Sequence, residues 1–207
     1  MNRLFHELHR KSREKRHAMF LRFMRPTAGT TILNVGATGR NTGIPEQFEH
    51  WYRPLDKITG GGLFFHEVVD YRVSFREVTP VVFDGCALPF ADNSFDIVYS
   101  NAVLEHLPDR DSMARFAQEI QRVGRGWFVA TPNRWYPVDP HYHLPFVQFL
   151  SQENQKRLVA RLGKVAYEHL VLLSRADLRR LFPTSKIAGC RVTFYAETLV
   201  AYRARQY

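Results

Sequence analysis

A glycine-containing turn at residues 34–43 is the first stretch whose residue types suit ligand binding. It follows the apolar run 31–35 and places Gly36 and Gly39 close together. Glycines let the backbone approach a ligand, and the N-terminus of a following helix favours a carboxylate or a phosphate. The same pattern also fits a plain tight turn, so it needs support from elsewhere in the chain.

The stretch 84–107 is far more specific. An acid directly follows a strand-like run, and a Leu-Pro-Phe turn comes next. A Ser-Phe-Asp segment then opens another apolar run, and Leu-Glu-His follows it. These groups are Asp84-Gly85-Cys86, Leu88-Pro89-Phe90, Ser94-Phe95-Asp96, Asn101-Ala102 and Leu104-Glu105-His106.

In this order and spacing the stretch resembles the class I S-adenosylmethionine-dependent methyltransferases, and more closely their type 11-like domain. Residues 131–137 with His141 also look like members of that family after their fifth strand. The resemblance covers about residues 30 to 204. It implies a methyltransferase that uses S-adenosyl-L-methionine as its cofactor.

The resemblance also implies roles for individual residues. Asp84 would accept a hydrogen bond from the adenine amino group, because a buried donor needs an acceptor. Gly85 and Cys86 would lie behind the adenine ring, and the turn 36–39 under the methionine end. The full set of expected cofactor contacts is Asn34, Gly36, Ala37, Thr38, Gly39, Gly62, Asp84, Gly85, Cys86, Asn101 and Ala102.

The sequence departs from the family pattern in two places. Asn34 stands where the family usually has an acid, and Thr38 and Arg40 replace later glycines of the turn. The acid expected to bind the ribose is also missing. Asp70 lies only 14 residues before Asp84, too few for a helix and a strand. We therefore expect the second strand to end within residues 60–63, and Asp70 to lie on the next helix. Asp56 is an alternative ribose contact, and the insertion 41–55 is expected to fold over the site.

Methyl transfer from a sulfonium is an in-line displacement, which requires alignment of the acceptor and at most a base for its proton. Candidates for the base are His106 and His141, with Glu105 and His143 as alternatives. His106 also fits a structural or cofactor-packing role. His141 belongs to a proline-rich loop beyond the fifth strand, where we expect the acceptor to bind.

The elements that must position these residues alternate along the chain. Strand-like apolar runs occupy residues 31–35, 57–63, 78–83, 95–100 and 126–131, and a helix-like period runs from Met113 to Val123. Such alternation predicts a doubly wound α/β fold with a parallel sheet and helices on both faces. Near the C-terminus, a helix at 174–181 precedes strands at 187–194 and 198–204, whose short connection predicts an antiparallel hairpin. The resemblance implies a Rossmann-like sheet of seven strands.

The net charge of +9 is concentrated at the two ends of the 207-residue chain. Residues 1–25 carry +6 and residues 175–207 carry +5, whereas the part between them is near neutral. The apolar spacing and the basic residues of segment 1–25 predict an amphipathic helical extension that Pro26 ends. The methyltransferase domain is then expected at 26–207. This extension fits either a helix packed over the edge of the sheet or a contact with a membrane surface or polyanion. Without a signal peptide or an apolar span, we expect a cytoplasmic location, with or without contact to the inner face of a membrane.

The sequence thus favours an enzyme that methylates a small or carrier-linked acceptor, such as a sugar, a lipid-linked intermediate or a metabolite. A degenerate, non-catalytic cofactor-binding or interaction module of the same fold is the alternative. A nucleic-acid methyltransferase is disfavoured, because residues 100–103 lack the Pro-Pro-aromatic turn typical of that class. Cys86 and Cys190 have no Cys or His partner at zinc-ligand spacing, so no metal site is expected.

Overall fold

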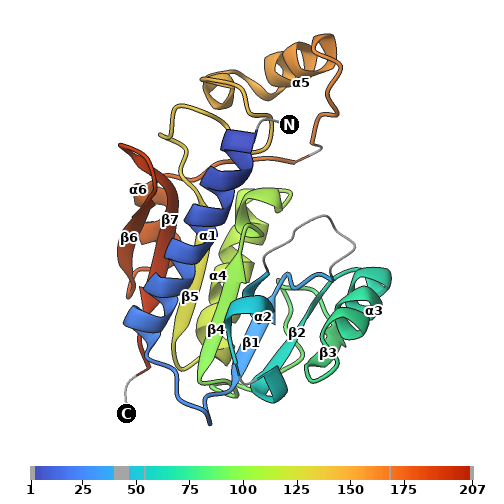
Figure 1. The fold of residues 1–207 in the computed structure, drawn as a ribbon, viewed down its shortest axis with the longest axis vertical. Helices are drawn as coiled ribbons and strands as arrows, with labels where there is room; N and C mark the ends of the chain where they lie inside the picture. The colour runs from blue at the N-terminus through green and yellow to red at the C-terminus, as the bar shows by residue number, and fades with distance from the viewer. Residues whose placement is uncertain (1–2, 40–46, 54, 168, 206–207) are drawn as a thin grey trace.

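The computed structural model describes residues 3–39, 47–53, 55–167 and 169–205. Its centre is a seven-stranded sheet with the strand order β3-β2-β1-β4-β5-β7-β6 (Figure 1). Five strands form its parallel part, and they are β1 (Ile32–Val35), β2 (Ile58–Gly62), β3 (Thr79–Val82), β4 (Ile97–Asn101) and β5 (Trp127–Pro132). The hairpin of β6 (Lys186–Arg191) and β7 (Ala196–Arg203) is antiparallel, and β7 pairs with β5. The predicted sheet, including its C-terminal hairpin, is confirmed.

Helices cover both faces of this sheet (Figure 1). One face carries α1 (Arg3–Met24), α2 (Phe48–Trp51) and α3 (Phe65–Ser74), and the other carries α4 (Arg110–Val123) and α6 (Arg175–Leu181). Alternate strand residues point to opposite faces, so Ile32 packs under the first group and Leu33 under the second. α5 (Gln152–Arg161) lies apart from the sheet, over a smaller apolar cluster around Tyr142 and Val159. Short 3₁₀ turns are η2 (Leu55–Lys57), η3 (Leu104–His106) and η4 (Val147–Phe149).

The capping residues explain where the two predicted helices begin. The side chain of Asp109 accepts a hydrogen bond from the Ser112 amide at 2.6 Å, which starts α4, and Gly124 ends it. Ser174 and Asp177 form a reciprocal capping box at the start of α6. The helix and strand predicted around Asp70 are also confirmed, because β2 ends at Gly62 and Asp70 lies in α3.

α1 is one continuous helix that packs on the sheet face over β5, β7 and β6. Its Phe20 is fully buried and makes edge-to-face contacts with the rings of four aromatic residues, Phe48, Tyr52, Tyr99 and Phe128. α1 therefore contributes to the main core, while the domain boundary expected at residue 25 stays a prediction. Among the described residues, no helix is both long enough and apolar enough to cross a membrane.

Candidate active site

A cleft of about 560 Å³ opens at the carboxyl ends of the central parallel strands. This is the edge where open α/β sheets bind their ligands, at the point where the strand order changes direction between β1 and β4. α1, the loop after β5 and the β6–β7 hairpin complete its walls. Eight of the predicted site residues line the cleft, namely Asn34, Gly36, Ala37, Thr38, Asn101, Ala102, His141 and His143.

The glycine turn after β1 forms part of the floor of this cleft. The Gly36 and Ala37 amides both donate to the Gly61 carbonyl, at 2.8 and 3.1 Å. Gly36 has a φ of +86°, and a side chain there would meet the Val103 side chain at 2.2 Å. Gly39 is buried against Asp70, whose carboxylate would overlap any Cβ at position 39. Both glycines are therefore required by the fold of the turn, and Arg40 to Gly43 lie outside the described residues.

A buried acid that the sequence did not single out, Glu49, lies next to Asn34. Its Oε1 accepts hydrogen bonds from Asn34 Nδ2 at 2.6 Å and from the Tyr71 hydroxyl at 2.8 Å. Glu49 lines the cleft but is only 1% exposed, and burial raises the pKa of its carboxyl group. The cleft thus has a carboxyl group beside the position where Asn34 replaces the acid of the family pattern. Glu49 belongs to the insertion 41–55, whose described part lines the cleft through Gln47 and α2.

The end of β4 contributes Asn101 and Ala102. Ala102 adopts a left-handed conformation with a φ of +58°, while its amide donates to the Ala130 carbonyl at 2.9 Å. A non-glycine residue in this region costs about 1–3 kcal/mol, and such strain concentrates at functional sites. The turn holds Asn101 and Ala102 against the cleft, and their place near the reacting atoms stays a prediction.

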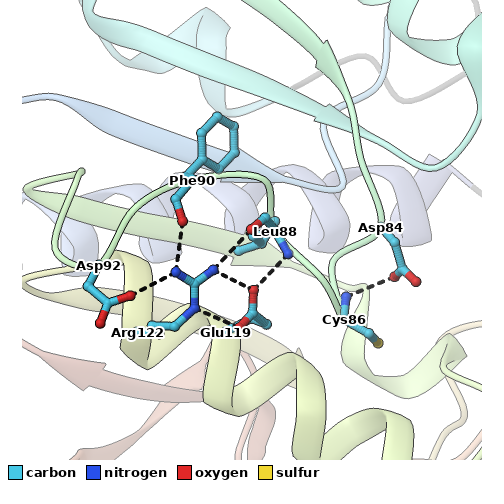
Figure 2. Close-up of polar contacts among 7 residues, drawn as sticks. All are labelled: Asp84, Cys86, Leu88, Phe90, Asp92, Glu119 and Arg122. Atoms are coloured by element: carbon cyan, nitrogen blue, oxygen red, sulfur yellow. Dashed lines mark hydrogen bonds and ion pairs between the residues drawn. The ribbon is translucent and has the colours of Figure 1, made fainter.

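The residues predicted to contact adenine lie after β3, outside the lining of the cleft. Asp84 is exposed, and its Oδ1 accepts a hydrogen bond from the Cys86 amide at 2.8 Å (Figure 2). Gly85 packs over Phe116, and Gly62 faces Gly36 at the end of β2. The structure therefore brings together the residues predicted for the methionine end, whereas those predicted for adenine, Asp84 to Cys86, form a separate group.

Two charged residues of α4 hold the segment that follows Asp84 (Figure 2). The Glu119 carboxylate accepts from the Leu88 amide at 2.7 Å. The Arg122 guanidinium donates to the carbonyls of Leu88 and Phe90, at 3.0 and 2.7 Å. Arg122 and Glu119 also bind each other. Side chains of α4 thereby hold the Leu-Pro-Phe turn through hydrogen bonds to its main chain.

The two histidines predicted as catalytic contact each other, and of the two only His141 lines the cleft. The ring centroids of His106, in η3, and His141, in the loop after β5, are 4.9 Å apart. Burial lowers the pKa of both, and that of His141 falls to about 4 with a further contribution from its histidine neighbours. Burial raises the pKa of the adjacent Glu105 to about 7. Asp139 accepts from the His141 and Tyr142 amides, both at 2.8 Å, which fixes the loop.

The alternative assignment of the ribose contact to Asp56 is wrong. Asp56 lies in η2 before β2, and therefore at the opposite edge of the sheet from the cleft. Asp70 instead lies beside the glycine turn, although it belongs to α3.

Two cations of α1, Arg13 and Arg16, line the cleft and were not predicted as site residues. Arg16 donates to the Ser12 and Thr198 hydroxyls, at 2.7 and 3.2 Å. The periodicity of residues 1–25 predicted a helix with a basic face, but not which of its residues meet the sheet. The burial of Phe20 and Met24 fixes the orientation of α1 on the sheet and thereby places Arg13 and Arg16 at the cleft.

Comparisons with known proteins agree with this fold. Residues 64–129 match the family model described as a methyltransferase domain. Two uncharacterised proteins of Mycobacterium tuberculosis are 26% identical to the chain over 82 residues, which is 39% of this chain and 28% of each of theirs. The chain thus matches less than a third of the length of these relatives.

Solved structures are similar over nearly the whole chain. A possible histamine N-methyltransferase of Thermotoga maritima has a TM-score of 0.61 at 15% identity, covering 96% of this chain and 92% of its own. The magnesium protoporphyrin IX methyltransferase of Synechocystis PCC 6803, solved with bound S-adenosylhomocysteine, has a TM-score of 0.58 at 15% identity, covering 99% and 89%. Residues 64–129 thus match a methyltransferase domain, and nearly the whole chain has the fold of solved methyltransferase structures, as its motifs predicted.

Proposed function

We propose that the chain binds S-adenosylmethionine in the cleft and catalyses methyl transfer to a small or carrier-linked acceptor. The observation that carries this proposal is the buried Glu49 carboxyl group beside the Gly36 turn. A methionine ammonium group is cationic, and a carboxylate at its binding site stabilises it in a low dielectric. Gly36 and Gly62 lie close together here, and neither has a side chain that would hinder the approach of the ligand to the main chain.

The adenine end of the cofactor would extend towards β3, where Asp84 can accept a hydrogen bond from its amino group. Asp84 is exposed, and the Cys86 amide orients its carboxylate through Oδ1. The contacts of α4 with the following turn support a fixed position for this group.

The bound cofactor would supply a methyl group on a sulfonium centre. The residues of the chain would then align the acceptor and take up its proton. His141 lies at the wall of the cleft, and we propose that it contacts the acceptor, with His106 packed behind it. His141→Ala should leave cofactor affinity unchanged and reduce turnover by about 10².

The wall formed by α1 and the β6–β7 hairpin favours an acceptor with an anionic group, because Arg13 and Arg16 line it. A sugar phosphate, a lipid-linked intermediate or an acidic metabolite has this chemistry. Several basic side chains on the outer face of α1, including Lys11 and Arg22, are exposed. They support a peripheral contact with an anionic membrane, which sedimentation of the intact chain with phosphatidylglycerol vesicles would test.

Calorimetric titration of the purified chain with S-adenosylmethionine, and separately with S-adenosylhomocysteine, tests the cofactor proposal. We expect one site with micromolar affinity for each ligand. A folded chain that binds neither at millimolar concentration would contradict the proposal. That result would favour the alternative function, a non-catalytic interaction module with a degenerate cofactor site.

A further inference from the structure

Three potential metal ligands converge beside the cleft, two from η3 and one from the loop after β5. Glu105, His106 and His141 each present one ligand atom, and these atoms lie within 4.8 Å of one another. Glu105 and His106 are consecutive, whereas His141 comes from beyond the next strand. The fold thus brings His141 next to a pair of residues from which it is distant in the sequence.

Two buried polar atoms of this cluster have no hydrogen-bond partner among the described residues. Glu105 is fully buried, and Thr131 donates to its Oε2 at 2.9 Å, but its Oε1 is unpaired. His141 Nδ1 is likewise buried and unpaired, with the Asp139 carboxylate 3.8 Å away. Buried polar atoms in proteins are almost always paired, so two unpaired ones in a single cluster indicate a missing partner. A carboxylate oxygen and a neutral imidazole nitrogen are both acceptors, and a cation satisfies both at once.

We propose that Glu105, His106 and His141 bind a divalent transition-metal ion, with Zn²⁺ as the preferred ion. Two imidazoles and one carboxylate suit Zn²⁺ or Fe²⁺, whereas Mg²⁺ and Ca²⁺ prefer oxygen ligands throughout. Ligand atoms lie about 2.0–2.2 Å from Zn²⁺ in a tetrahedral arrangement, so two of them on one ion are about 3.3–3.6 Å apart. The ligand atoms of the cluster lie within 4.8 Å of one another, so binding the ion requires side-chain rotations that bring them about 1 Å closer.

The surroundings of the cluster also have the character of a metal site. Metal ligands are usually oriented by a second hydrogen bond to a hydroxyl, a carboxylate or a backbone carbonyl. Thr131 orients Glu105 in this way, and His106 has a hydrogen bond with the backbone of His169. The ring of Tyr167 packs against both histidines, with centroids 5.4 Å from His106 and 5.3 Å from His141.

Three protein ligands leave at least one position of the ion for another molecule. Of the three ligands only His141 lines the cleft, together with Thr131, and we expect the open position to face the cleft on the His141 side. A metal ion there would bind a water or an acceptor oxygen and lower the pKa of that oxygen, as three-ligand zinc sites do. The metal site itself does not depend on the proposed methyl transfer, because it rests only on the three side chains and their surroundings.

The test uses the full chain, stripped with a chelator and dialysed, and titrated with ZnCl₂ and with MgCl₂ in separate calorimetric runs. We expect one Zn²⁺ per chain at micromolar affinity or tighter, and at least 100-fold weaker binding of Mg²⁺. Co²⁺ substituted for Zn²⁺ should give visible absorption bands of a site with mixed nitrogen and oxygen ligands.

Variants then assign the ligands. Glu105→Gln and His141→Ala should each weaken Zn²⁺ binding at least 100-fold, and Thr131→Val, which removes only the orienting hydroxyl, should weaken it about 10–100-fold. His66→Ala removes an exposed histidine of α3 and should leave the affinity unchanged. Circular dichroism of each variant establishes that it is folded, and Glu105→Gln retains an oxygen for the Thr131 hydroxyl.

Absence of Zn²⁺ binding by the folded chain would overturn the proposal. So would binding that survives Glu105→Gln and His141→Ala, because the ion would then be held by surface histidines. A preference for Mg²⁺ over Zn²⁺ would overturn the ligand set. None of these results depends on S-adenosylmethionine, so failure of the metal site and failure of the proposed cofactor binding are distinguishable.

Discussion

The substitution Glu49→Gln separates the contribution of this residue to cofactor binding from its contribution to folding. Both donors to Glu49, the Asn34 amide and the Tyr71 hydroxyl, converge on the same oxygen, Oε1. A glutamine keeps an oxygen at this place and both hydrogen bonds, and loses only the negative charge. A hydrogen bond to a charged group contributes about 1.5–3 kcal/mol. Since about 1.4 kcal/mol corresponds to a tenfold change, we expect the Kd for S-adenosylmethionine to rise about 10–150-fold.

Although Glu49→Gln should weaken cofactor binding, it should increase folding stability near neutral pH. Burial raises the pKa of Glu49 above its ordinary value of 4.5. The folded chain therefore holds this proton more tightly than the unfolded chain, so the associated stability is complete below pH 4.5 and is lost as the pH rises through the folded-state pKa. Glu49→Gln removes this loss, so it should raise the melting temperature near neutral pH and flatten its decrease with pH. Cofactor affinity of the native chain should instead increase over the same pH range, as the carboxylate forms.

The assay is calorimetric titration with S-adenosylmethionine, together with thermal unfolding between pH 4 and 8. Glu77→Gln changes the charge equally at an exposed position and serves as the control. In the double variant Asn34→Asp with Glu49→Gln, the charge moves to β1 while the pair can still hydrogen-bond, so most of the affinity should return. Unchanged affinity in Glu49→Gln, with the fold intact, would refute the assignment of this carboxylate to the cofactor site.

Three further predictions concern the core and the two ends of the cofactor site. Phe20→Ala should cost about 3–5 kcal/mol of unfolding free energy in denaturant titration, because Phe20 is fully buried among aromatic rings, whereas Leu21→Ala on the exposed side should cost little. Asp84→Ala should weaken S-adenosylmethionine binding about tenfold or more with no loss of melting temperature, and equal affinity would remove Asp84 from the adenine site. Ala102→Gly should raise stability by up to about 1 kcal/mol by relieving the left-handed backbone, and an unchanged or lower melting temperature would argue against strain at this turn.

The sequence predicted the order of the elements well because their signals are local. Buried strands read as apolar runs, and the period from Met113 to Val123 defines the buried face of α4. The three-residue connection after the sixth strand required an antiparallel hairpin, which β6 and β7 form.

The site was predicted less completely, because its remaining residues depend on packing between distant segments. Glu49 is an ordinary acid in an insertion, and only the position of α2 against Asn34 and Tyr71 places it in the cleft. Arg16 belongs to a helix whose orientation over the sheet depends on Phe20. Neither residue has a sequence spacing that indicates a ligand.

The packing of α1 against the β6–β7 hairpin brings segments from both ends of the chain into one wall of the cleft. Lys15 donates to the Arg191 carbonyl, Arg16 contacts Thr198, and the Cys190 thiol lies against the Ser12 carbonyl. Arg13 and Arg16 on this wall give the cleft a local positive field. Such a field accelerates the diffusional encounter with anions and is screened by salt. The entry rate of an anionic acceptor should therefore decrease with ionic strength, even where its rate of departure does not change.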